Sequence, residues 1–358
     1  MFYILGSKSY VPPEHGLNPI KLSEKPMVIH KMFLSMVAIA TVLAGCTGSS
    51  GSGSSPSGST NPTAGKSGKK IVLGFSQVGA ESGWRTANTQ SIHEAADKEG
   101  IDLKFSDAQQ KQENQIKAIK SFIAQGVDVI AFSPVVETGW QPVLEEAKRA
   151  HIPVIVSDRR PDVSDDLYAS FIGADFIKEG QMAATWLAKK MNGKATIAEI
   201  TGTVGSAPAN DRQKGFDDVL KTYPGMKVVF SQTGDFTRAG GKAVMEALLK
   251  SATGSTINAV FSHNDDMALG AIQAMQEAGK KPGTDITIVS VDGIKPIFEA
   301  MVKGQTNCTV ECNPLLGPLI MKTAEDLVAG KPVEKRIVLP DGQFDQTTAA
   351  KELPNRKY

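Results

Sequence analysis

Short apolar runs alternate with segments of helical spacing from Lys70 to the end of the chain. Within the runs, apolar and polar residues do not alternate cleanly, which favours parallel strands covered by helices on both faces. The first half of this region predicts strands at 71–77, 102–107, 128–133, 153–157 and 168–172. The second half predicts strands at 195–201, 226–231, 259–262, 286–291 and 307–311, and a last one at 336–339.

Helices are predicted between these strands. Segment 84–99 is followed by Gly100, a typical helix stop, and the next helix ends at Gly126. The later helices are predicted at 176–191, 207–222, 238–250, 267–278, 296–303 and 315–329. Ten or more strand–helix units exceed what one sheet accommodates comfortably, so we expect two α/β lobes, each built on a doubly wound sheet.

The segment before Lys70 has a different composition. Lys31 precedes an uncharged apolar stretch at 32–42, and Leu-Ala-Gly-Cys follows at 43–46. A basic flank, a short apolar segment and small residues are the parts of a secretory signal. Because this signal ends on Cys46, it resembles the lipobox of bacterial lipoproteins, in which that cysteine is acylated.

A transmembrane anchor is the alternative interpretation of this segment, but the apolar run is shorter than the roughly 20 residues that cross a bilayer. We therefore expect 1–46 to be a lipoprotein signal region, with Met27 as a hypothetical translation start. Residues 47–69 are rich in Ser and Gly, which is typical of a flexible tether. The sequence predicts a protein that works outside the cytoplasmic membrane and is held there by a lipid on Cys46.

Charge and cysteine content exclude several classes of protein. The chain has 358 residues and a formal net charge of +1, which gives no electrostatic reason to expect nucleic acid as a partner. Cys308 and Cys312 remain if Cys46 is acylated. In a strand their Cα atoms would lie ~13 Å apart, beyond disulfide reach, so we expect two free, half-buried thiols. No zinc-site spacing and no cofactor motif is present, and we expect neither a metal nor a cofactor.

Polar side chains gather where the predicted strands end: Gln77, Asp107, Asp158, Arg159, Asp175, Asn264, Asp265, Asp292 and Glu311. Open parallel sheets bind ligands outside these carboxyl ends. Helix N-caps are the ordinary alternative, and this interpretation suffices for Asp107 and Asp175. It is weak for Asp158 and Arg159, which directly follow a buried strand, and we expect these two to contact a ligand.

The loop after the first strand combines three kinds of group that suit a neutral, polyhydroxylated ring. Glu81 supplies a carboxylate, Arg85 a guanidinium and Trp84 an indole on which an apolar face can stack. Burial in the core is the alternative for any Trp. We expect it for Trp140 and Trp186, whereas Trp84 begins a helix in a polar loop and is predicted to stack on ligand.

A longer ordered set of stretches covers 71 to about 339: 74–79, 81–85, 109–116, 134–136, 138–140, 158–159, 202–205, 211–212, 234–238, 263–267 and 292–293. In this order the stretches resemble the type I periplasmic binding proteins of sugar ABC transporters. More narrowly, they are similar to the galactofuranose-binding members of that family. After Ile337 the sequence follows the family less closely.

The resemblance implies two Rossmann-like (flavodoxin-like) lobes, joined by a hinge of three segments, that close on a sugar. Crossovers near Gly173, Asn313 and Pro340 would make both lobes discontinuous. The N-terminal lobe would comprise 70–173 and 313–340, and the C-terminal lobe 174–312 and 341–358. The closed protein would deliver its monosaccharide to the transmembrane subunits of an ABC permease.

The resemblance also implies a set of ligand contacts. From the first lobe these are Glu81, Ser82, Gly83, Trp84, Arg85, Asp158 and Arg159, and from the second lobe Arg212, Asn264 and Asp292. Gln77, Asp235, Phe236 and Glu311 are candidates for a layer behind these contacts. Without the resemblance, Arg212 has the pattern of an ordinary surface residue at the start of a helix.

A glycosidase and a transcription repressor fit this sequence less well than a sugar-binding protein. A glycosidase needs two carboxylates at one bond, but the acids here have Arg neighbours, which favours permanently ionised acceptors over a general acid. Sugar-responsive repressors share this fold, but a lipidation signal stands where their DNA-binding segment would be. We therefore expect a monomeric binding protein and no enzyme. Two alternatives stay open: a sensory receptor that reports to a membrane kinase or chemoreceptor, and a binder of another pentose, hexose or cyclitol.

Overall fold

The computed structural model describes residues 70–358. The predicted signal region, the predicted lipidation site Cys46 and the predicted tether at 47–69 lie outside the described residues. No helix within the described part of the chain is both long and apolar enough to cross a membrane.

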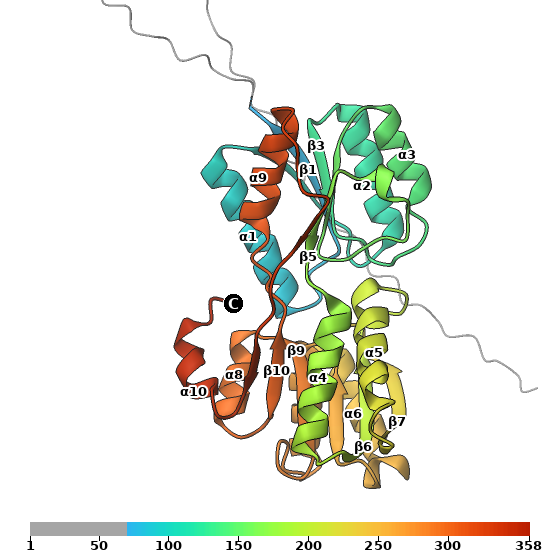
Figure 1. Ribbon diagram of the computed structural model, residues 1–358, viewed down its shortest axis with the longest axis vertical. Helices are drawn as coiled ribbons and strands as arrows, with labels where there is room; N and C mark the ends of the chain where they lie inside the picture. The colour runs from blue at the N-terminus through green and yellow to red at the C-terminus, as the bar shows by residue number, and fades with distance from the viewer. Residues whose placement is uncertain (1–69) are drawn as a thin grey trace, which may run out of the picture. The chain divides into compact units, whose positions relative to one another are not determined.

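One six-stranded sheet is formed mainly by the first half of the described chain (Figure 1). Its strands pair in the order β11-β5-β4-β3-β1-β2, and all pairs are parallel. The strands are β1 (Val72–Gln77), β2 (Asp102–Asp107), β3 (Val129–Phe132), β4 (Val154–Ser157), β5 (Ser170–Gly173) and β11 (Arg336–Val338). The helices associated with this sheet are α1 (Gly83–Glu99), α2 (Gln112–Gln125), α3 (Gln141–Arg149) and α9 (Gly317–Val328). Strands β3, β4 and β5 are buried throughout, as expected for a sheet covered on both faces.

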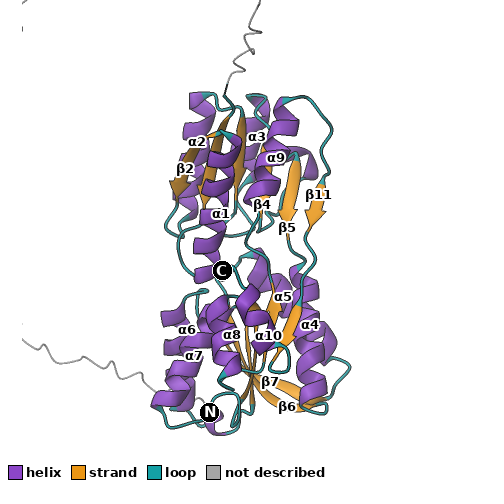
Figure 2. Cartoon of the chain, turned by 90° about the vertical axis from the view of Figure 1, so that its left-hand side faces the viewer, coloured by secondary structure: helices purple, strands orange, loops and turns teal. Residues whose placement is uncertain are grey.

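A second six-stranded sheet has the order β12-β10-β9-β8-β6-β7. Its strands are β6 (Lys194–Thr201), β7 (Gly225–Thr233), β8 (Ala259–Ser262), β9 (Thr287–Asp292), β10 (Cys308–Glu311) and β12 (Gln343–Asp345). Helices α4 (Phe176–Lys190), α5 (Ala207–Leu220), α6 (Arg238–Leu249), α7 (Asp265–Glu277), α8 (Lys295–Val302) and α10 (Ala349–Glu352) accompany it. Figure 2 shows the purple helices packed against the orange strands.

These two sheets confirm the predicted fold class, a pair of doubly wound α/β lobes. In each sheet the chain begins at an inner strand, adds one neighbour on one side and then builds outward on the other. The order of winding therefore reverses between β1 and β3 in one lobe and between β6 and β8 in the other. Ligands bind at such reversals, outside the carboxyl ends of the strands. The predicted residue ranges of the two lobes stay a prediction.

The structure differs from the sequence-based expectations at three places. Asp107 was expected to cap a helix, but α2 begins after Lys111, and the Asp107 carboxylate accepts a hydrogen bond from the Gln109 N–H in the preceding turn. Cys308 and Cys312 are free, as predicted, but both are buried rather than half-buried. Burial raises the pKa of both thiols well above the usual value.

The third difference is β12, an antiparallel edge strand that the sequence pattern did not predict. It spans only three residues, Gln343–Asp345, which is too short for a periodic signal. It lies in the tail, where the family resemblance weakens.

The helix cap predicted at Asp175 is present. Its carboxylate accepts a hydrogen bond from the Lys178 N–H at the start of α4.

Helices α4 and α5 pack closely because two glycines face the opposite helix. A Cβ atom added at Gly180 would lie 2.1 Å from the Arg212 carbonyl oxygen, and one at Gly215 would lie 2.0 Å from the Ile177 carbonyl oxygen. Contacts this short do not occur, so any larger residue would push the helices apart. The close packing matters because it fixes the position of Arg212 relative to α4.

We predict that Gly180→Ala lowers the free energy of unfolding by about 1–3 kcal/mol, because the added methyl group overpacks a close-packed interface. Alanine favours a helix over glycine, which offsets part of the loss. Urea denaturation measures the change. Gln181→Ala, an exposed substitution on the same helix, is the control and should change stability by no more than about 0.5 kcal/mol. An unchanged free energy of unfolding for Gly180→Ala would contradict the packing argument.

Candidate ligand-binding site

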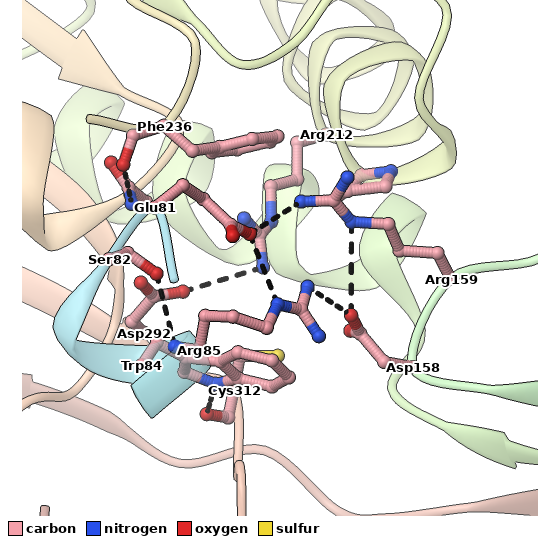
Figure 3. A pocket seen from close by; sticks show the side chains of 12 residues that line it. Glu81, Ser82, Trp84, Arg85, Asp158, Arg159, Arg212, Phe236, Asp292 and Cys312 are labelled. Atoms are coloured by element: carbon pink, nitrogen blue, oxygen red, sulfur yellow. Dashed lines mark hydrogen bonds and ion pairs between the residues drawn. The ribbon is translucent and has the colours of Figure 1, made fainter. Parts of the chain in front are cut away.

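A cavity with an empty volume of about 290 Å³ lies at the carboxyl ends of both sheets. Figure 3 shows the 12 side chains that line it. They are Glu81, Ser82, Trp84, Arg85, Asp158, Arg159, Pro208, Arg212, Phe236, Asn264, Asp292 and Cys312.

The first lobe contributes a network of four ionised side chains. Arg85 contacts Glu81 Oε1 through Nε at 3.0 Å and Asp158 Oδ2 through Nη2 at 2.6 Å. Arg159 contacts the same Glu81 oxygen through Nη2 at 3.3 Å. Each acid is therefore shared between neighbouring guanidinium groups, and each Arg is held by more than one partner. The side chains are fixed before any ligand arrives.

Local structure places these groups. Ser82 caps α1 by accepting a hydrogen bond from the Arg85 N–H, so the helix begins at the pocket. One turn separates Glu81 from Arg85, which brings their side chains together. Asp158 follows β4 and has a φ of 62°, a left-handed conformation that side chains rarely adopt. This turn directs its carboxylate to Arg85 and to the Ser133 hydroxyl, which donates at 3.1 Å.

Two polar atoms of this network make no hydrogen bond within the described part of the chain: Glu81 Oε2 and Arg159 Nε. Both are buried, and an unpaired buried polar atom is costly unless a ligand or water completes it. Burial lowers the pKa of Arg159 to about 10, and the positive charge of Arg85 adds to the effect. The positive charge of Arg159 is thus only partly balanced by the neighbouring acids, and its free Nε–H can donate to an additional partner.

Trp84 forms part of the wall between the two lobes. Its indole Nε1 donates a hydrogen bond to the Cys312 carbonyl oxygen at 2.6 Å, and the Arg85 guanidinium lies 4.7 Å from its ring centre. The ring is therefore fixed in orientation at the edge of the cavity. Trp140 is buried in the core of the first lobe, and Trp186 is partly buried against the core of the second lobe, as expected from the sequence.

The second lobe contributes Arg212, which is almost fully buried. Its Nε donates to Glu179 Oε2 at 2.7 Å, and its Nη1 donates to the His263 carbonyl oxygen at 2.7 Å. Its Nη2 lies 3.7 Å from Asp292 Oδ1, too far for a hydrogen bond. Burial opposes the charge of Arg212, but Glu179 and the other acids outweigh it and raise its pKa.

Asn264 and Asp292 complete this side. Asn264 caps α7 by accepting from the Met267 N–H, and its amide donates to the Phe236 carbonyl oxygen at 3.0 Å. Asn264 therefore both caps α7 and lines the cavity. Phe236 and Asp292 have φ values of 60° and 130°, so strained backbone occurs on this side as well. Burial raises the pKa of Asp292 well above its usual value, against the pull of Arg212.

Direct contacts join the lobes beside the cavity. The Gly83 N–H donates to Asp266 Oδ2 at 2.6 Å, and the Glu137 N–H donates to the Gly205 carbonyl oxygen at 2.9 Å. Asn210 also donates to Glu137 Oε2 at 2.5 Å. These contacts do not involve the cavity-lining side chains, so they hold the lobes together independently of a ligand.

Most of the predicted contact residues line the cavity, together with Phe236 from the predicted outer layer. One predicted contact, Gly83, does not line it, and neither do three candidates for the layer behind the contacts: Gln77, Asp235 and Glu311. Gly83 bonds across to Asp266, and Gln77 lies behind Arg85, whose Nη1 donates to it at 3.2 Å. Asp235 is exposed, and Glu311 pairs with Arg356.

Sequence reasoning missed Pro208 and Cys312 in the wall, and Glu179 and Asp266 behind it. Cys312 directly follows β10, so the rule that ligands lie beyond strand ends would have found it. Glu179 lies inside a helix and carries no such signal.

Comparison with known proteins identifies the family to which this chain is similar. Residues 73–332 match the family model of the periplasmic binding protein domain. The galactofuranose-binding protein YtfQ of Escherichia coli is 48% identical over 291 residues, which cover 80% of this chain and 92% of that protein. The fructose import binding protein FruE of Bifidobacterium longum is 33% identical and covers 83% of this chain.

Two solved structures are similar over 80% of the chain, each with a TM-score of 0.78. One is the periplasmic component of the arabinose ABC transporter from Shewanella sp. ANA-3 bound to α- and β-L-arabinofuranose, at 53% identity and 96% coverage of that chain. The other is a Mycobacterium smegmatis protein in complex with β-D-fucofuranose, at 56% identity and 95% coverage. The sequence and structural matches agree, and the chain belongs to the periplasmic binding protein family.

Proposed function

We propose that this protein captures a monosaccharide in its furanose form, with galactofuranose as the first candidate, and delivers it to an ABC permease. Its relatives are sugar-binding transport proteins and not enzymes. The observation that carries the proposal is the composition of the cavity wall: three guanidinium groups and three carboxylates, drawn from both lobes.

This wall suits a neutral ring with several hydroxyls. Each hydroxyl can donate to a carboxylate and accept from a guanidinium, so ionised groups of both signs satisfy it. An anionic ligand would meet Glu81, Asp158 and Asp292, and a cationic ligand would meet three Arg residues. Trp84 and Phe236 supply apolar surfaces for the C–H faces of the ring. Similar proteins bound to arabinofuranose and fucofuranose support a five-membered ring.

The proposed capture mechanism follows from the way in which the two lobes share the residues of the cavity wall. All four members of the network around Arg85 and Asp158 come from the first lobe, so they can hold a sugar in an open cleft. Closure then brings Arg212, Asn264 and Asp292 onto the opposite hydroxyls. Only the closed state offers contacts from both lobes, so the sugar shifts the population toward it. The permease would recognise that closed state, and its ATPase subunits would drive transport.

The proposed location follows from the N-terminal residues. We propose that Cys46 carries a lipid that anchors the protein to the outer face of the cytoplasmic membrane. Residues 47–69 would then form a tether that lets the two lobes reach a permease in the same membrane. A family of extracytoplasmic binding proteins is consistent with this position.

Arg159→Ala should weaken sugar binding about ten-fold or more, because a buried hydrogen bond to a charged group contributes roughly 1.5–3 kcal/mol. Isothermal titration calorimetry with D-galactose, L-arabinose, D-fucose and D-ribose, each at its equilibrium of ring forms, measures the change. The control is Arg149→Ala, an exposed residue of the same lobe that forms a 3.8 Å ion pair with half-buried Glu145. Equal affinities for Arg159→Ala and the unaltered protein would refute this site, and no binding of any sugar would refute the function.

Cys46→Ala should abolish lipid attachment and release the protein from the membrane. The full chain is expressed in bacteria fed an alkyne fatty acid, and label and membrane fraction are followed on gels. Cys308→Ala is the control: it removes a buried thiol and should leave both readouts unchanged. Label that persists in Cys46→Ala, or an unlabelled full chain that still fractionates with membranes, would contradict the anchor.

A further inference from the structure

Arg212 is held on three sides, and only one edge of its guanidinium remains available. Nε is bonded to Glu179, Nη1 is bonded to the His263 carbonyl oxygen, and the guanidinium carbon lies 5.0 Å from the Phe176 ring centre. Nη2 makes only the 3.7 Å ion pair with Asp292. Among the contacts of the described residues, Nη2 is thus the nitrogen with no hydrogen bond, and both of its N–H groups can donate into the cavity.

Glu179 is the strongest of these constraints. Its side chain is fully buried, and its Oε2 accepts the 2.7 Å hydrogen bond from Arg212 Nε. A charge-assisted bond of this length fixes both partners in orientation. Its other oxygen, Oε1, makes no hydrogen bond within the described part of the chain. Glu179 does not line the cavity, so any effect that it has on a ligand is indirect, through Arg212 above all and also through the Cys312 thiol.

The chain places Glu179 and Phe176 together by building α4 from a capped start. Asp175 caps the helix, and Phe176 and Glu179 follow at a spacing of three, on one face of the first turn. Gly180 then allows the α5 backbone to approach, which brings Arg212 over that face. Figure 1 shows α4 and α5 side by side in the second lobe. The first turn of α4 thus contacts and positions the guanidinium group of Arg212.

From this arrangement we infer that Glu179 is a positioning residue, which holds Arg212 so that Nη2 faces the cavity and thereby sets the affinity for the ligand. The inference deepens the proposed function and rests on it for the effect on sugar affinity. The geometry of Arg212 itself does not depend on the identity of the ligand. The two can therefore be tested separately.

Burial raises the pKa of Glu179, and the charge and hydrogen bond of Arg212 act against that, followed by a smaller contribution from the Cys312 thiol. Loss of Arg212 would therefore let Glu179 take up a proton rather than remain as an unpaired buried charge. For this reason, the effect of removing Glu179 can be measured cleanly in a protein that already lacks Arg212.

The first experiment needs no sugar. The arginine Nε–Hε signals of the ¹⁵N-labelled protein are recorded by NMR, and the Arg212 signal is assigned as the one absent from Arg212→Lys. We expect a sharp signal that is protected from solvent exchange. Glu179→Ala should lose that protection, and Glu179→Gln, which keeps an acceptor oxygen, should retain most of it. Unchanged protection in Glu179→Ala would overturn the positioning role.

The second experiment measures affinity by calorimetry, with the tightest-binding sugar of the panel above, in a double-mutant cycle. Glu179→Ala should weaken binding about ten-fold or more, Glu179→Gln should weaken it less, and Glu179→Ala should have little further effect in Arg212→Ala. Glu199→Gln is the control, since Glu199 is a buried acid of the same lobe that bonds the side chains of His263, Gln213 and Ser231, none of which lines the cavity. His263 holds Arg212 through its backbone carbonyl and not through the ring that Glu199 bonds.

The outcomes separate the two ideas. Equal losses from Glu179→Ala with and without Arg212, or a similar loss in Glu199→Gln, would show a general effect on the lobe and overturn the inference. If Glu179→Ala fails to fold, Glu179→Gln in both backgrounds gives the same cycle. If no sugar binds the unaltered protein, the proposed function fails, and the NMR result alone decides whether Glu179 positions Arg212.

Discussion

Mutual neutralisation of buried ions is the constraint on which the pocket depends. Arg85, Arg159 and Arg212 are nearly inaccessible to solvent, and so are the acids that face them. An isolated buried charge costs several kcal/mol, and a buried ion pair often stabilises a protein no better than apolar residues of the same shape. Stability alone therefore gives no reason for such a network. Its value lies in a rigid set of charged donors and acceptors that no longer needs water and can be completed by hydroxyl groups.

The backbone at the pocket follows the same logic. Asp158, Phe236 and Asp292 all have positive φ values, the first two in loops after β4 and β7 and the third as the last residue of β9. Such conformations cost of order 1–3 kcal/mol each and persist only where the surroundings fix them. Here β4 is buried throughout and β9 is buried from its second residue, and the three side chains converge on one cavity. The sheets therefore stabilise a geometry that the loops would not adopt alone.

Much of this architecture could be predicted from the sequence because the signals are local. Buried parallel strands appear as apolar runs, and the polar residues that follow them mark the edge where ligands bind. This reasoning located Asp158, Arg159, Asn264 and Asp292 without any relative. It failed for Asp107, because a carboxylate after a strand can bond its own turn instead of a helix.

The residues that local pattern could not reveal are those whose role depends on contact between helices. Arg212 resembles an exposed residue of α5 until Gly180 and Gly215 are seen to bring α4 against it. Glu179 has no sequence signal for the same reason. Acids and arginines within amphipathic helices are usually solvated, and only the packing of the two helices shows that this pair is buried.

The contacts that join the lobes outside the cavity affect ligand affinity without touching a ligand. The bonds from Gly83 to Asp266 and from Glu137 to Gly205 can form only when the lobes meet, so they lower the free energy of the closed state whether or not sugar is present. Apparent affinity scales with the fraction of protein in the binding-competent state. Stronger contacts here would tighten binding, but they would also retain the sugar when the lobes must separate. A transport receptor therefore needs contacts here that can break again, and hydrogen bonds between polar groups, which water can replace when the lobes separate, meet that need.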